Sequence, residues 1–115
     1  MIVSLRGTLL GTTGEGATLE CAGVGRYGSL APSALARLPP AGEEVFLLVV
    51  ESVAMYGGGT TLYGFLSDEE RRIFNVVREN VPGTGAKKAL EILEKAAKSL
   101  PDFRRAIMEK DARAL

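Results

Sequence analysis

The chain has 115 residues, of which 46% are hydrophobic and 24% charged, and its formal net charge is zero. This length fits one ordinary domain of about 100–150 residues or two very small ones, and it excludes a large multidomain enzyme. The hydrophobic content is sufficient for a core, so we expect a globular protein. The longest apolar run, residues 45–50, is far shorter than the roughly 20 residues of a membrane span, and no signal peptide precedes it. We therefore expect a cytoplasmic protein without membrane contact.

The cysteine and histidine content narrows the possible chemistry. Cys21 is the single cysteine and cannot form an internal disulfide, and a chain without histidine cannot build a zinc site of the Cys/His kind. The lack of histidine also removes the Ser-His-Asp and Cys-His catalytic arrangements and the commonest general base near neutral pH. We therefore predict a non-catalytic protein that needs no cofactor, with Cys21 as a small core residue.

The first part of the chain has the pattern of short β-strands. Strands are predicted at residues 2–10, 17–22, 26–30, 45–55 and 60–65, because β-branched and aliphatic residues gather there between glycine-rich or proline-rich turns. Residues 33–38 lie between prolines and are predicted as one helical turn. So many short strands favour a small closed barrel, since closure removes the exposed edges of the sheet.

At Ser67 the hydrophobic period changes from two to about 3.6. Ser67 and Glu70 have the spacing of a capping box, and acidic residues occupy the first turn, where the helix dipole favours them. A helix is therefore predicted to begin here and to end near Asn80, because Pro82 disfavours a helical conformation at the preceding residue.

Two more helices are predicted after this one. Residues 86–98 place alanine and leucine on one stripe and charged residues largely off it, which is typical of an amphipathic helix. A third helix is expected to be capped at Ser99. We accordingly divide the chain into a barrel, residues 1–66, and a helical domain, residues 67–115.

A glycine loop at residues 82–85, between the first two of these helices, is the most informative local motif. Its amides and the N-terminus of the next helix can converge on a phosphate oxygen, with lysines adding positive charge. A plain helix–helix turn that needs glycine for its geometry alone explains the same residues. The formal charge is −2 over residues 1–66 and +2 over residues 67–115, which favours an anion at the helical part. The candidate phosphate-binding residues are Gly83, Thr84, Gly85, Ala86, Lys87 and Lys88.

Other motifs have simpler explanations. A G-x-G-x-x-G pattern at residues 23–28 follows a predicted strand, but a dinucleotide site requires a helix to begin there, so we expect a bend. The acidic residues 68–70 resemble a metal or acid–base cluster, and helix capping accounts for them. The doublets at 87–88 and 104–105 could touch nucleic acid, although such doublets usually face solvent. The aromatic residues are too sparse to predict a stacking platform.

In order and spacing, several short motifs resemble the RuvA family of Holliday-junction-binding proteins. They are Leu5-Arg6-Gly7, Gly23-Val24-Gly25, Leu38-Pro39 with Gly42-Glu43-Glu44-Val45, Leu62-Tyr63-Gly64-Phe65, Glu69-Glu70 with Phe74, and Gly83-Thr84-Gly85-Ala86-Lys87 with Ala89-Leu90 and Ile92-Leu93. The resemblance covers almost the whole chain.

This resemblance implies an α+β protein with an N-terminal OB-fold-like β-barrel followed by an all-α helix-hairpin-helix domain. It further implies a non-enzymatic homo-oligomer, a tetramer in the family, that holds four-way junctions open for the motor RuvB in recombination and repair. By position, the backbone amides that grip phosphates would be those of Gly83, Thr84, Gly85 and Lys87. Such contacts carry no sequence information, so we expect structure-selective, salt-sensitive binding to four-way junction or duplex DNA.

The sequence departs from the family pattern in three places. An acidic Glu-Asp pin is replaced by residues 56–59, Tyr-Gly-Gly-Gly, and the nearest acid is Glu51. Residues 109–115 resemble the approach to a second hairpin motif but include no glycine loop, and no motor-binding domain follows, so we expect no RuvB recruitment. These departures leave open a second interpretation, a RuvA-like scaffold for protein interaction or oligomerisation that does not bind DNA.

Overall fold

The computed structural model describes residues 1–53, 58–80 and 85–98, with side chains up to Lys95 in the last range. The chain divides into two compact units, Met1–Ser67 and Asp68–Leu115. The sequence pattern changes at the same point, between a period of two and a period of 3.6 residues. The division into a barrel domain of residues 1–66 and a helical domain of residues 67–115 stays a prediction.

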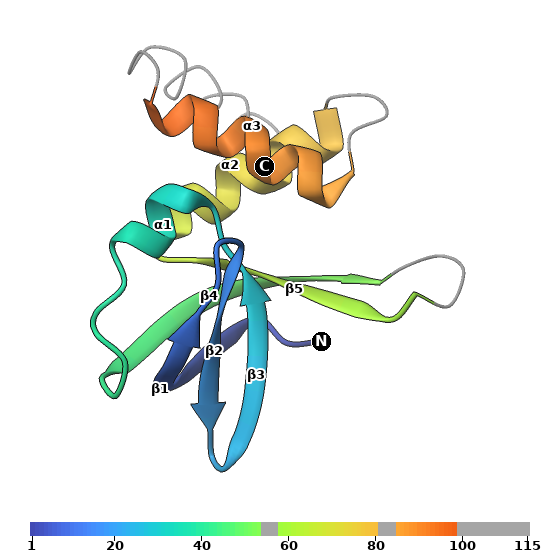
Figure 1. The fold of residues 1–115 in the computed structure, drawn as a ribbon. Helices are drawn as coiled ribbons and strands as arrows, with labels where there is room; N and C mark the ends of the chain where they lie inside the picture. Colours follow the sequence, from blue (N-terminus) through green and yellow to red (C-terminus); the bar gives the residue numbers. More distant parts are fainter. Residues whose placement is uncertain (54–57, 81–84, 99–115) are drawn as a thin grey trace. The chain divides into compact units, whose positions relative to one another are not determined.

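The first unit is a closed five-stranded barrel (Figure 1). Its strands are β1 (Ser4–Thr12), β2 (Gly16–Cys21), β3 (Val24–Ser29), β4 (Glu44–Val53) and β5 (Thr60–Phe65), and the short helix α1 (Pro32–Ala36) lies between β3 and β4 in the chain. The order around the barrel is β1-β2-β3-β5-β4. The predicted barrel, its five strands and the helical turn are confirmed, with strand ends displaced by up to two residues.

β1 closes the barrel because it pairs with two neighbours in succession. Its first half pairs antiparallel with β4, from Ser4 to Thr8, and its second half pairs antiparallel with β2. The register shifts between Leu9 and Gly11, so a bulge bends the strand where it passes from one partner to the other. On the opposite side, β3 and β5 meet in parallel at Ser29 and Tyr63.

The interior of the barrel is apolar and is formed by alternating residues of its strands, together with Leu30 after β3 and Ala34 of α1. Cys21 is half-buried and packs against this core, as expected of a small core residue. The buried members of the core are Leu5, Leu9, Ala17, Leu19, Leu30, Ala34, Val45, Leu47 and Val49.

The glycines of the G-x-G-x-x-G pattern belong to a hairpin. Ala22 and Gly23 both have positive φ, 52° and 85°, and form the two-residue turn between β2 and β3. The following residues continue as strand β3. The dinucleotide interpretation requires a helix to begin at this point, and none does. The expected bend is confirmed.

The second unit contains two described helices, α2 (Asp68–Asn80) and α3 (Ala86–Lys98), which pack against each other. α2 buries one face, formed by Ile73, Phe74, Val76 and Val77. Ala89 and Leu93 are buried on α3. Both helices agree with the sequence prediction, which rested on apolar residues at intervals of three and four. The third predicted helix and loop residues 81–84 lie outside the described residues.

Candidate nucleic-acid interface

The described part of the predicted phosphate-binding motif is the N-terminus of α3. Gly83 and Thr84 lie outside the described residues, whereas Gly85, Ala86, Lys87 and Lys88 are described. The Ala89 N–H donates a hydrogen bond of 3.0 Å to the Gly85 carbonyl, which is the first bond of the helix. Gly85 is therefore the N-cap, and the next three residues form the first turn.

This first turn presents hydrogen-bond donors and positive charge together. The N–H groups of Ala86, Lys87 and Lys88 have no carbonyl partner within the helix, because they precede its first bond. The two lysine side chains are exposed, and the first turn contains no acidic residue. Since the N-terminus of a helix already carries a partial positive charge, the lysines add to an unbalanced positive field. An oxyanion is the ligand that this combination suits.

Gly85 leaves space for a close approach. A Cβ built at this position would meet no heavy atom of the described residues within 4 Å, and the backbone φ lies outside the left-handed region. Neither crowding by the described residues nor backbone strain therefore accounts for glycine here. A phosphate could reach the first-turn amides over this bare position.

The arginines of α2 interact with other residues of the same helix. Arg71 and Arg72 both contact Asp68, at N–O distances of 2.6 Å and 3.0 Å. The guanidinium of Arg78 lies 5.5 Å from the centre of the Phe74 ring, in a cation–π arrangement. Each arginine of this helix thus has an intramolecular partner.

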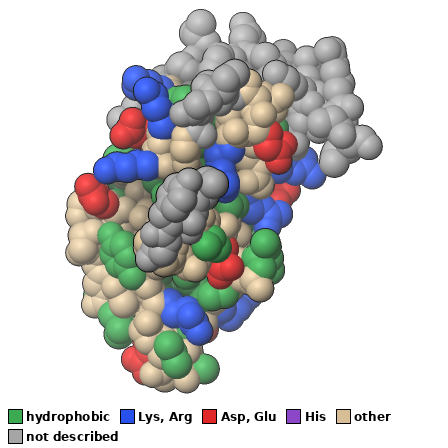
Figure 2. All heavy atoms as spheres, turned by 90° about the vertical axis from the view of Figure 1, so that its right-hand side faces the viewer, with side chains coloured by type: hydrophobic (Ala, Val, Ile, Leu, Met, Phe, Trp, Pro, Cys, Tyr) green, Lys and Arg blue, Asp and Glu red, His purple; other side chains and the backbone are tan. Residues whose placement is uncertain are grey.

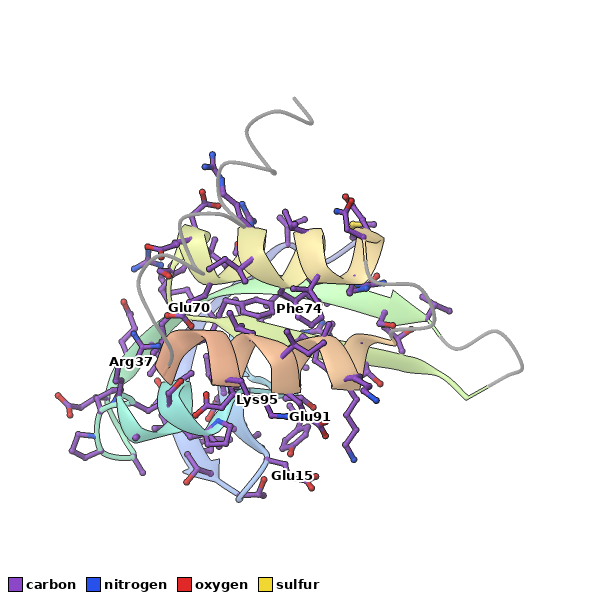
Figure 3. All side chains as sticks on the ribbon, turned by 90° about the horizontal axis from the view of Figure 1, so that it is seen from above. Glu15, Arg37, Glu70, Phe74, Glu91 and Lys95 are labelled. Carbon is purple, nitrogen blue, oxygen red and sulfur yellow. The ribbon has the colours of Figure 1, made fainter. Side chains whose placement is uncertain are left out.

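The described lysines of α3 differ in this respect. Lys87, Lys88 and Lys95 are exposed and have no hydrogen bond or ion pair with any described residue. Glu91 and Lys95 project from α3 on the side away from α2, whereas Phe74 points from α2 toward α3 (Figure 3). We call these three lysines the α3 lysine face. Sequence analysis identified the first two, and the helical spacing that adds Lys95 was already visible in the sequence.

The barrel surface shows no comparable gathering of cations among its described residues. Arg6 is 3.2 Å from the Glu44 carboxylate and 4.9 Å from the centre of the Phe46 ring, so its charge is already partnered. On the face seen in Figure 2, lysine and arginine side chains alternate with carboxylates and hydrophobic side chains. Sequence reasoning missed the Arg6–Phe46 contact, which depends on the register between β1 and β4.

The aromatic side chain of Tyr27 is held against the barrel. Its hydroxyl lies 3.1 Å from Thr13 Oγ1, and a Cβ at Gly16 would come within 2.5 Å of that hydroxyl. Tyr27 therefore fixes the β1–β2 loop against β3, and glycine at position 16 makes room for the ring. Phe46, the other exposed aromatic residue on the described barrel, belongs to the Arg6 contact on β4. The two rings lie on β3 and β4, which are not neighbouring strands of the barrel.

The β4–β5 hairpin carries little charge where it is described. Glu51 accepts a hydrogen bond of 3.3 Å from the Ile2 N–H, so its carboxylate contacts the N-terminal segment. The described residues beyond it, 52–53 and 58–61, are uncharged. Of residues 56–59, where the acidic pin of the family would fall, the first two lie outside the described part of the chain.

The described residues contain no group of three or more Cys, Asp or Glu side chains placed to hold a metal ion. In the acidic first turn of α2, Asp68 contacts two arginines of its own helix. None of the helices described in the structure has the length and apolar character needed to cross a membrane.

A closed five-stranded barrel in the order β1-β2-β3-β5-β4 places the first unit among OB-fold-like domains. The family model described as the RuvA N terminal domain matches residues 1–64. The chain therefore belongs to the RuvA family.

Curated relatives extend the similarity over the whole chain. The chain is 40% identical over 115 residues to a protein of Elusimicrobium minutum, covering 100% of this chain and 56% of the relative. It is 39% identical over 112 residues to a protein of Endomicrobium trichonymphae, covering 96% and 55%. Both relatives are named Holliday junction branch migration complex subunit RuvA. The chain thus spans about half the length of these relatives.

Proposed function

We propose that the chain binds four-way junction DNA in recombination and repair, without catalysing a reaction, as a RuvA-like homo-oligomer. In this proposal α2, the loop after it and α3 form a helix-hairpin-helix motif that grips phosphates. The gripping residues are Gly83, Thr84, Gly85, Ala86, Lys87 and Lys88. The names of the relatives support the class of DNA, and family membership supports a binding role rather than a catalytic one.

The observation that carries the proposal is the charge and geometry of the α3 N-terminus. Donor N–H groups, two exposed lysines and a bare N-cap glycine occur together there, and no acidic residue occupies the first turn. Backbone amides at a helix N-terminus hold a phosphate without contacting a base. Binding should therefore depend on DNA structure and on salt, and little on sequence.

Oligomerisation is part of the proposal because a single hairpin on a chain of zero net charge should bind weakly. Several copies on one junction convert later contacts into intramolecular ones and raise the effective concentration. A tetramer, as in the RuvA family, would place one such hairpin on each arm of a four-way junction. The proposal covers DNA and copies of this chain, and it assigns no surface of the described residues to the motor RuvB.

Fluorescence anisotropy with a labelled four-way junction and a duplex of the same sequence tests the proposal at low and moderate salt. We expect tighter binding to the junction and weaker binding as salt rises. Gly85→Val should weaken binding by filling the open position, with a modest loss of helix stability because valine is a poor N-cap. Gly11→Val is the matched control, since a Cβ at Gly11 also meets no heavy atom within 4 Å and the residue lies on the barrel.

The absence of binding to either DNA at low salt, by a chain that sediments as an oligomer, would contradict the proposal. That result would support the scaffold interpretation, in which the chain retains the architecture for protein interaction or oligomerisation. Equal affinity of Gly85→Val and Gly11→Val for the junction would show that the loop before α3 does not contact DNA. Any binding would then involve another surface.

A further inference from the structure

The α3 lysine face extends beyond the first turn of the helix. Lys87, Glu91 and Lys95 follow one another at intervals of four residues and therefore lie on one side of α3. This side is opposite to the buried residues Ala89 and Leu93. Because each residue of an α-helix rises 1.5 Å, Lys95 lies about 12 Å along the axis from Lys87.

The charged side chains on this side, Lys87, Glu91 and Lys95, form no ion pair with a described residue. Lys95 and Glu91 have the order and spacing that favour an ion pair on a helix, yet no contact within 4 Å joins them. On α2, by contrast, each arginine has a partner in its own helix. Lys87, Lys88 and Lys95 are therefore available to an external anion over two turns of α3. DNA, a polyanion with regularly repeated phosphates, matches such an arrangement of cations.

We propose that α3 lies lengthwise against the DNA backbone, so that Lys95 contacts phosphates beyond those held at the helix N-terminus. The same placement puts the Glu91 carboxylate close to the DNA, where it lowers the affinity. This inference rests on the proposed function and deepens it, because it names a further phosphate contact and an opposing charge within the same binding surface.

The dimensions of DNA agree with a lengthwise placement. Each strand carries one phosphate per 3.4 Å of duplex axis, so a span of about 12 Å covers roughly three to four phosphate steps. Lys95 could therefore meet a phosphate different from the one at the first turn. If α3 pointed end-on at the DNA, Lys95 would lie about a Debye length farther away at 0.1 M salt and its charge would be largely screened.

Glu91 lies between two lysines and opposes their effect. A carboxylate beside a phosphate backbone is a like-charge contact, which disfavours the bound state. Replacing it with glutamine removes the charge, keeps the shape and retains a residue that favours helix. Opposite effects at Glu91 and Lys95 are a signature that a purely solvated helix surface would not produce.

The test measures junction affinity of Lys95→Ala and Glu91→Gln by anisotropy between about 0.05 and 0.2 M salt. We expect Lys95→Ala to weaken binding about three- to tenfold and to reduce the slope of log K against log salt by about one for each bound contact. Glu91→Gln should strengthen binding by a similar factor. Far-UV circular dichroism and thermal unfolding confirm that both variants keep their helices.

Two barrel variants control for net charge. Arg26 and Glu43 are exposed, and neither side chain has a hydrogen bond or ion pair with a described residue. Arg26→Ala and Glu43→Gln make the same changes of charge as the α3 variants, and we expect each to alter the affinity less than twofold. Effects at Lys95 and Glu91 equal to those of the controls would overturn the lengthwise placement.

A third variant separates failure of this inference from failure of the proposed function. If Lys87→Glu abolishes binding while Lys95→Ala and Glu91→Gln behave as the controls, the hairpin grips phosphates end-on and only the inference is wrong. If the unmodified chain binds no junction at low salt, the proposed function itself is wrong.

Discussion

The first turns of α2 and α3 carry side chains of opposite charge, although the helix dipole places a partial positive charge at both N-termini. α2 begins with Asp68, Glu69 and Glu70, which complement the positive end of the helix dipole. α3 begins with Ala86, Lys87 and Lys88, which oppose it. A helix start of the first kind is stabilised by its own residues, whereas one of the second kind gains stability when an anion binds.

The cations of the two helices follow the same division. α2 uses arginines, and these contact Asp68 and the Phe74 ring. On α3, Lys87, Lys88 and Lys95 are exposed, and their charged heads contact no described acidic residue. The comparison separates cations that are paired within their own helix from cations available for a ligand, and it predicts that substitutions on the two helices affect different measurements.

The largest expected effect is on the packing that holds α2 in place. Phe74 is completely buried, so Phe74→Ala should lower the free energy of unfolding by about 3–5 kcal/mol through lost burial and a remaining cavity. Chemical denaturation monitored by circular dichroism measures the loss. Glu79→Ala, an exposed change on the same helix, is the control. A loss below about 1 kcal/mol would mean that the α2 face contributes little to stability.

The next largest effect is on DNA affinity. Lys87→Glu reverses a charge at the proposed phosphate site and should weaken junction binding more than tenfold at low salt, because it replaces an attraction by a repulsion. Arg71→Ala removes a cation that is already paired with Asp68, and we expect less than a twofold change in affinity. Similar losses in both variants, measured by anisotropy, would break the distinction between the two helices.

Much of this fold could be predicted from the sequence because its patterns are local. Turn glycines such as Gly23 and the change of period at Ser67 mark the elements directly. The contact of Arg6 with Phe46 could not be predicted, because it joins residues far apart in the chain through the register of two strands.

At the candidate site, the sequence indicated the lysines of the first turn of α3. It could not show whether they were paired. Only the structure distinguishes the engaged Arg71 from the unengaged Lys87 and Lys95, since both types of residue have acidic neighbours at helical spacing. Ion pairing depends on side-chain conformation, which the spacing of residues along a helix permits but does not determine.

A smaller effect is expected at the start of α2. Asp68→Ala removes a carboxylate that contacts two arginines and complements the helix dipole, so stability should fall by about 1 kcal/mol. Because Asp68 is half-exposed, high salt should screen the interaction and reduce the difference from the unmodified chain. Thermal unfolding at low and high salt measures this. A loss of stability that does not depend on salt would indicate that Asp68 acts through hydrogen bonding rather than charge. The junction affinity of Asp68→Ala should stay within twofold of that of the unmodified chain.

The smallest expected effect has the opposite sign and tests the comparison most directly. Lys88→Glu places an acid in the third position of α3, where the helix dipole favours it, and should raise the free energy of unfolding by about 0.5 kcal/mol. Lys88→Gln should give about half of this gain, because it removes the repulsion without adding an attraction. Thermal unfolding in low salt measures both variants.

The same two variants should lose junction affinity in the reverse order, with Lys88→Glu the weaker binder. Lys88 would then lower the stability of the chain while raising its affinity for DNA. Such a trade-off is expected where a binding surface lies at a helix end whose charge is unfavourable in the absence of ligand. If Lys88→Glu neither stabilises the chain nor weakens its binding, the positive first turn of α3 is an ordinary solvated helix start, and its difference from α2 has no functional meaning.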